Sequence, residues 1–161
     1  MIVALMACSA SAGPSLKIGS PAPSFDLKLT SGQPLSLEKY LGRDVIILSF
    51  FASWSKTCQQ EISYMQELER AYGRKGLSII GVSYDRKTGE LKDFLNDNKV
   101  AFPVAHDQKL KTLQTYRVII LPTLIVIDRQ GNISQIYLDF DGNVEKALDQ
   151  DIQRLLTTRQ G

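Results

Sequence analysis

The sequence is poor in the residues that build metal centres. It has only two cysteines and one histidine among 161 residues, which is too few for a structural zinc site. No stretch reaches the roughly 18 to 20 consecutive apolar residues that span a bilayer. The net charge is only +2, so we expect neither a nucleic-acid-binding surface nor a polybasic membrane patch.

What is present fits one globular domain. A chain of 161 residues buries roughly 70% of its unfolded surface, which is enough for one core without disulfide staples. The composition is 43% hydrophobic and 22% charged, which argues against disorder. We find no internal repeat, and we predict a domain over residues 17–161 that follows a separate segment, residues 1–16.

Residues 1–16 are apolar at first and then rich in small side chains. Leu5–Cys8 resembles the motif that precedes a lipidated cysteine, and Ala10–Ala12 would suit a signal peptidase. The apolar part is short and no Lys or Arg precedes it, so a flexible tail or a truncated piece is the alternative. We expect the remnant of an export signal, with Cys8 as a possible lipid anchor.

The stretch from Val45 to Tyr72 changes its hydrophobic period in the middle. Val45–Phe51 is a nearly continuous apolar run, typical of a strand buried on both faces. After a loop at Ala52–Lys56, the apolar residues recur at helical spacing, in the stripe Cys58, Ile62, Met65, Leu68 and Tyr72. Strand ends and helix N-termini are where α/β proteins place reactive groups, and both Trp54 and Cys58 lie there.

The rest of the chain completes an α/β pattern. Phe25–Leu29 and the turn Thr30–Gln33 predict an N-terminal β-hairpin. Further strands and amphipathic helices alternate along the chain. We predict a mixed β-sheet with helices on both faces, from strands at Leu77–Ser83, Thr123–Ile127 and Ile133–Leu138, an extended piece at Phe102–Val104, and helices at Thr88–Asn98, Lys109–Tyr116 and Val144–Leu156.

These motifs together resemble a known family. The chain resembles thioredoxin-fold proteins, and among them the exported TlpA/ResA-type thiol-disulfide oxidoreductases that are grouped with the AhpC/TSA redoxins. The resemblance covers about Ile18–Leu156 and implies a thioredoxin-like fold. It is carried by Phe51–Cys58, Glu61, Gly81–Ser83, Phe102–Val104, Pro122–Thr123 and Ile127–Gly131.

The chain departs from this family at the site itself. The family carries Trp-Cys-x-x-Cys, where this chain has Trp54, Ser55, Lys56, Thr57 and Cys58. In the family the first Cys is the nucleophile, and a helix N-terminus lowers the pKa of such a thiol. A serine hydroxyl does not exchange with disulfides, so we expect the chain as written to be inactive in dithiol exchange.

Three of these positions allow two interpretations each. Ser55 is either an ordinary helix N-cap or a deliberate replacement of a cysteine. Cys58 is either a buried, inert thiol or a reactive one, as in a single-Cys peroxidase with Ser three residues earlier. Peroxiredoxins, however, have Pro at the place of Phe51 and an Arg at the place of Pro122. Glu61 is either a proton-transfer group, as the resemblance implies, or a solvated helix carboxylate.

The resemblance also implies a substrate groove. The family's proline at the place of Pro122 is cis, so we predict a cis peptide bond between Leu121 and Pro122. Together with Trp54 and Ser55, these two residues are expected to hold an extended substrate chain.

We therefore predict a cell-envelope thiol-disulfide oxidoreductase with an incomplete active-site pair, made of Ser55, Cys58 and Glu61. The alternatives are a single-Cys peroxidase that uses Cys58 and a redox-inactive module that binds peptides or thiols. The expected partners are protein or peptide thiols and disulfides and an electron-donor redox protein. The resemblance implies no metal or organic cofactor. It suggests a periplasmic or membrane-anchored location, with cytochrome c maturation as one setting.

Overall fold

A computed structural model of the chain describes residues 16–158. Cys8 and the motif around it lie outside the described residues, so the expectations for residues 1–16 stay predictions.

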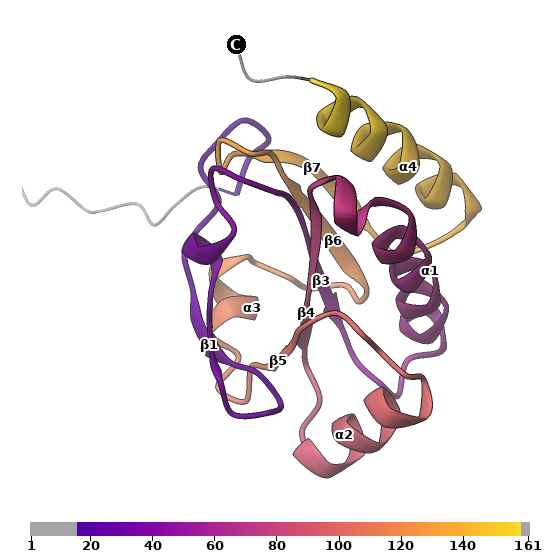
Figure 1. The fold of residues 1–161 in the computed structure, drawn as a ribbon. Helices are drawn as coiled ribbons and strands as arrows, with labels where there is room; N and C mark the ends of the chain where they lie inside the picture. The colour runs from indigo at the N-terminus through magenta and orange to yellow at the C-terminus, as the bar shows by residue number, and fades with distance from the viewer. Residues whose placement is uncertain (1–15, 159–161) are drawn as a thin grey trace, which may run out of the picture.

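A five-stranded mixed sheet forms the centre of the fold (Figure 1), in the order β5-β4-β3-β6-β7. β3 pairs parallel with β4 and antiparallel with β6, while β5 and β7 are the edge strands. The central position of β3 agrees with its sequence, because all seven of its residues are buried. The strands are β3 (Val45–Phe51), β4 (Leu77–Ser83), β5 (Val104–His106), β6 (Thr123–Ile127) and β7 (Ile133–Leu138).

Helices cover both faces of this sheet, as the sequence predicted. α1 and α4 lie on one face, and α3 lies on the other together with the N-terminal hairpin (Figure 1). The hairpin consists of β1 (Asp26–Lys28) and β2 (Pro34–Ser36), which pair antiparallel. The helices are α1 (Lys56–Tyr72), α2 (Thr88–Asp97), α3 (Lys111–Thr115) and α4 (Gly142–Thr157), and single 3-10 turns occur at Leu37–Lys39 and Gly73–Lys75.

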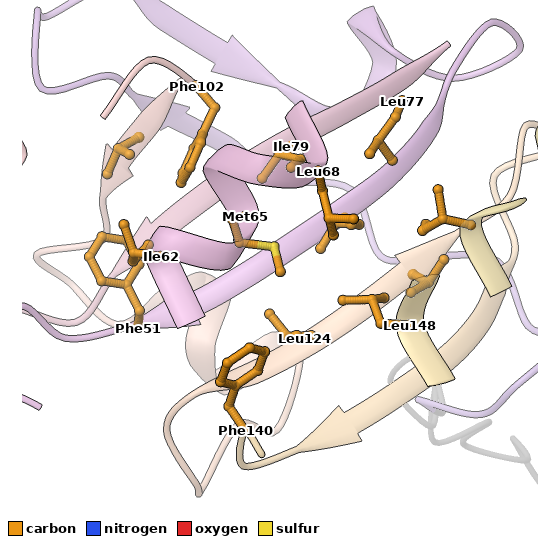
Figure 2. Close-up of a cluster of buried hydrophobic side chains, with 14 of the residues drawn as sticks. Phe51, Ile62, Met65, Leu68, Leu77, Ile79, Phe102, Leu124, Phe140 and Leu148 are labelled. Atoms are coloured by element: carbon orange, nitrogen blue, oxygen red, sulfur yellow. The ribbon is translucent and has the colours of Figure 1, made fainter. Parts of the chain in front are cut away.

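The two faces of β3 supply two hydrophobic cores. Alternate side chains of a strand point to opposite faces, so Ile47 and Phe51 pack with the cluster under α1 and α4, while Ile46, Leu48 and Phe50 pack on the hairpin side. Figure 2 shows the first cluster, where Met65 from α1 and Leu148 from α4 approach the sheet. Each fully buried side chain of this size contributes roughly 1.5–3 kcal/mol of hydrophobic stabilisation.

Helix ends differ from the predicted ones. α1 begins at Lys56, two residues before its apolar stripe, because Ser55 caps it there. α3 is shorter than the predicted Lys109–Tyr116, because Leu110 has a left-handed backbone with φ 55°. Since β3 and β4 run parallel, the loops that follow them emerge at the same edge of the sheet, and Tyr84 N–H donates to Phe51 C=O at 2.8 Å.

Candidate functional site

The loop between β3 and α1 presents Trp54 and Ser55. Trp54 is 67% exposed, as expected for a residue beside a binding groove rather than in the core. Ser55 is the N-cap of α1, and its hydroxyl oxygen accepts a hydrogen bond from Cys58 N–H at 3.4 Å. Ser55 therefore caps α1, which agrees with both interpretations of this serine.

A buried carboxylate supports this loop from the neighbouring strand. Asp85 is only 3% exposed, and it accepts hydrogen bonds from Ser53 N–H at 3.1 Å and from the Ser53 hydroxyl at 2.6 Å. The Ser83 hydroxyl donates to the same carboxylate at 2.7 Å, and the Gln59 side chain donates to Ser53 C=O at 2.9 Å. Sequence reasoning missed Asp85, whose only signal was its place just after a buried strand.

The segment before β6 contributes Val118, Ile119 and Leu121 to the same site. The peptide bond between Leu121 and Pro122 is cis, which confirms the prediction, and the Thr123 hydroxyl donates to Ile120 C=O at 2.7 Å. Ile119 in this segment is 91% exposed. The sequence predicted no site residue in this segment before Leu121.

Three of the predicted site residues, Trp54, Ser55 and Leu121, meet around one cavity. Its volume is about 420 Å³. Pro122 is buried directly after Leu121 and does not line this cavity. The remaining lining residues are Tyr84, Leu113, Val118 and Ile119.

Cys58 lies in the first turn of α1, with its side chain fully buried. Burial raises the pKa of the Cys58 thiol, and the Ser55 hydroxyl and the Ala52 backbone offset part of that rise. The nearby Glu61 carboxylate would raise the pKa of this thiol further. The position corresponds to the buried-thiol interpretation, because a nucleophilic cysteine needs both exposure and a lowered pKa.

Glu61 is also fully buried, one helical turn beyond Cys58. The interpretation of a solvated helix carboxylate is therefore wrong, because a spacing of three residues from Cys58 keeps Glu61 on the buried stripe. Among residues 16–158, neither carboxyl oxygen has a hydrogen-bond partner. Burial raises the pKa of Glu61 to about 8, and the neighbouring Ser49 hydroxyl offsets a small part of this rise. At neutral pH, Glu61 is thus mainly a neutral acid that can exchange a proton.

His106 ends β5 beside this network. Its Nε2 contacts Asp85 C=O, and its Nδ1 lies 3.1 Å from the Thr88 hydroxyl. Within residues 16–158, no three His, Cys, Asp or Glu side chains are grouped as metal ligands. Over the same residues, no helix is both long and apolar enough to cross a membrane.

Comparison with known proteins agrees with this geometry. The sequence model of the AhpC/TSA family matches residues 18–136, most of the chain. The chain belongs to the AhpC/TSA family. It shares 36% identity over 120 residues with the thiol-disulfide oxidoreductase ResA of Bacillus thuringiensis subsp. konkukian, covering 74% of this chain and 69% of that protein.

Two further proteins support the same relationship. ResA of Geobacillus kaustophilus is 32% identical over 142 residues, covering 88% of this chain and 78% of that one. A solved structure from Chlorobium tepidum, assigned as thiol:disulfide interchange protein DsbE, superimposes with a TM-score of 0.84 at 34% identity, over 88% of this chain and 99% of that one. The chain is thus one of the thioredoxin-like, ResA/DsbE-type thiol-disulfide oxidoreductases, as the sequence motifs predicted.

Proposed function

We propose that this AhpC/TSA-family chain binds protein or peptide thiols and disulfides in the cavity between Trp54 and Leu121, and that Ser55 stops the covalent step. One observation carries the proposal. Ser55 stands at the cap of α1 and lines the cavity, whereas Cys58, the only cysteine of residues 16–158, is buried behind it. A substrate sulfur in the cavity therefore meets a hydroxyl, which stays protonated near neutral pH and does not exchange with a disulfide.

A thiol at position 55 would complete the exchange reaction. Its thiolate would attack one sulfur of the substrate disulfide, form a mixed disulfide and release the other sulfur as a thiolate. The Cys58 thiolate would then attack the sulfur at position 55, form the 55–58 disulfide and release the second substrate thiolate. An added dithiol or a redox protein would reduce the 55–58 disulfide for the next cycle.

Glu61 is the proposed proton acceptor for Cys58 in that second step. A general base works best when its pKa lies near the working pH, and burial raises the pKa of Glu61 to about 8. Glu61 and Cys58 occupy successive turns of the buried face of α1. The ionised fraction of Glu61, which grows as the pH approaches 8, would therefore take the proton of the thiol without passing it through bulk water.

Insulin-disulfide reduction with dithiothreitol tests the proposal. The chain as written should add nothing to the rate of dithiothreitol alone, and Ser55→Cys should accelerate insulin reduction. Ser63→Cys is the matched control, because it adds a thiol to the exposed side of the same helix. An inactive Ser55→Cys variant that folds normally would overturn the proposal, as would equal activity of the two cysteine variants.

The geometry does not favour the single-Cys peroxidase. Such an enzyme needs an exposed thiolate, whereas the Cys58 side chain is fully buried and the pKa of its thiol is raised. Peroxide consumption by the chain as written, abolished in Cys58→Ala, would reverse this conclusion.

We further propose that the chain acts outside the cytoplasm, in the periplasm or anchored to the membrane through Cys8, with cytochrome c maturation as one setting. The proposal rests on the sequence Leu5–Cys8 and on the similarity to the ResA proteins. Expression in bacteria with labelled palmitate tests the anchor. Label should enter the chain as written and be absent from Cys8→Ser; equal labelling of both would overturn it.

A further inference from the structure

A second cavity adjoins the first, and the two share a wall. Trp54 and Tyr84 line both of them. The first cavity continues toward Leu113, Val118 and Ile119, and the second toward the start of α2. The second has a volume of about 480 Å³ and is completed by Arg86, Lys87 and Glu90. Ser55 lines only the first, so the reacting position lies beside the shared wall.

The first cavity is an apolar surface. Apart from Trp54, Ser55 and Tyr84, its lining consists of aliphatic side chains, and Ile119 exposes 91% of its surface to solvent. Exposed aliphatic and aromatic side chains of this size gain hydrophobic free energy when a partner covers them. An apolar side chain of a bound polypeptide would cover Ile119 and Trp54 together.

The second cavity is positively charged. Lys87 pairs with Glu90 at 2.6 Å, so their charges largely cancel, whereas Arg86 is exposed and forms no ion pair with any residue from 16 to 158. The first turn of the nearby α1 has no acidic residue and begins with Lys56. The residues that line this cavity therefore carry one net positive charge, that of Arg86, and a carboxylate is its natural bidentate partner.

We propose that the chain selects polypeptides whose reactive cysteine lies between an apolar side chain and an acidic one. The apolar side chain would enter the cavity of Leu113 and Ile119, and the acidic one would pair with Arg86, with Trp54 between them. An extended chain rises about 3.3 Å per residue, so residues up to two positions before and after the cysteine span about 13 Å, and we expect this span to cover the two cavities that share Trp54 and Tyr84. This selectivity rests on the proposed function, in which the first cavity holds the substrate.

Trp54 fluorescence measures this selectivity directly. Trp54 is the only tryptophan of the chain and lines both cavities, so peptide binding should change its emission. The probes are peptides with an S-methylcysteine, leucine on one side and glutamate, glutamine or lysine on the other, in both chain directions. We expect the glutamate peptides to bind about 3- to 10-fold more tightly than the lysine peptides at low salt, with the ratio approaching one in high salt.

Two matched pairs of variants separate the contributions of the two cavities. Arg86→Glu should reverse the preference for glutamate, whereas Lys92→Glu, an equal change of charge at an exposed position further along α2, should preserve it. Ile119→Ser should weaken the binding of the leucine peptides about 5-fold relative to otherwise identical peptides with alanine in place of leucine. Ile18→Ser, which changes an exposed isoleucine that lines neither cavity, should leave that ratio unchanged.

The outcomes distinguish this inference from the function on which it rests. Equal affinity for the glutamate, glutamine and lysine peptides, or an unchanged preference in Arg86→Glu, would overturn the selectivity. Insulin reduction by Ser55→Cys would still stand in that case. If no peptide changed Trp54 fluorescence and Ser55→Cys were also inactive, both the selectivity and the proposed function would fail.

Discussion

The Asp85 carboxylate accepts hydrogen bonds from both the backbone N–H and the hydroxyl of Ser53, at 3.1 Å and 2.6 Å. Ser53 is the second residue after β3, and Asp85 is the second residue after β4. The two parallel strands therefore jointly fix the loop that carries Trp54 and Ser55. The position of the site therefore depends on a buried charge rather than on packing alone.

Removal of that charge should destabilise the fold. Asp85→Ala leaves three buried donors without their acceptor, namely the Ser53 N–H and the hydroxyls of Ser53 and Ser83. We expect a loss of about 1–3 kcal/mol in the free energy of unfolding. Asp85→Asn keeps one acceptor oxygen and should lose less. Urea unfolding measures both, with Asp93→Asn on the exposed side of α2 as the control. A loss in Asp85→Ala no larger than that in the control would contradict this role.

Glu61 should make the stability of the protein depend on pH. In the unfolded chain its pKa is near the ordinary 4.5, whereas burial raises the folded value to about 8. As the pH rises between these values, the unfolded state releases the proton first. The free energy of unfolding should therefore fall by up to about 1.4 kcal/mol per pH unit through this group, and the fall should end above pH 8, where the folded state ionises too.

The comparison of Glu61→Gln with the unmodified chain isolates this effect. The variant has no carboxyl at this position, so its stability relative to the unmodified chain should increase steadily from pH 5 to pH 8. Urea unfolding across that range gives the difference. Glu67→Gln, at an exposed position of the same helix, should differ from the unmodified chain by a constant amount. A constant difference for Glu61→Gln as well would show that the buried carboxyl is already ionised.

The sequence predicted most of the fold because each element carries its own local signal. β3, β4, β6 and β7 have the predicted bounds, since each is an apolar or β-branched run closed by glycine, proline or turn residues. Helix bounds were less accurate. A helix begins where a side chain can cap it, as Ser55 does for α1, and this point need not coincide with the first apolar residue of the stripe.

The site was only partly predictable for a different reason. Trp54, Ser55 and Leu121 came from motifs, but the partner of Asp85 lies 32 residues earlier in the chain. Only the pairing of β3 with β4 brings the two together, and no local pattern specifies that pairing. Similarly, nothing in the sequence indicated that Ile119 is exposed beside the cavity, because an apolar run does not reveal which of its residues lie outside the core.

Gly81 and Gly89 should respond to alanine in opposite directions. A Cβ at Gly81 in β4 would lie 3.0 Å from Val104 Cγ2 and 3.1 Å from Phe51 Cε1. Both neighbours are buried side chains, so Gly81→Ala should cost about 1–3 kcal/mol of stability through overpacking. Gly89 lies in α2 with nothing within 4 Å of the added Cβ, and Gly89→Ala should stabilise by about 0.5–1 kcal/mol. Thermal unfolding of the two variants checks the signs, and a loss of equal size in both would contradict the packing argument.

Cys58 should resist alkylation until the fold opens. Its side chain is fully buried and the pKa of its thiol is raised by that burial, so a reagent needs both an opening of α1 and a deprotonated sulfur. In a Cys8→Ser background, we expect iodoacetamide to label the folded chain on the order of 100-fold more slowly than the urea-unfolded chain. Ser55→Cys in the same background, once reduced and freed of reductant, should add one rapidly labelled thiol with an apparent pKa below 8.5, because the N-terminus of α1 stabilises a thiolate there. Mass spectrometry over a series of pH values distinguishes the two sites. Rapid labelling of Cys58 itself at neutral pH would contradict the buried geometry and would favour a peroxide-reducing thiolate at that position.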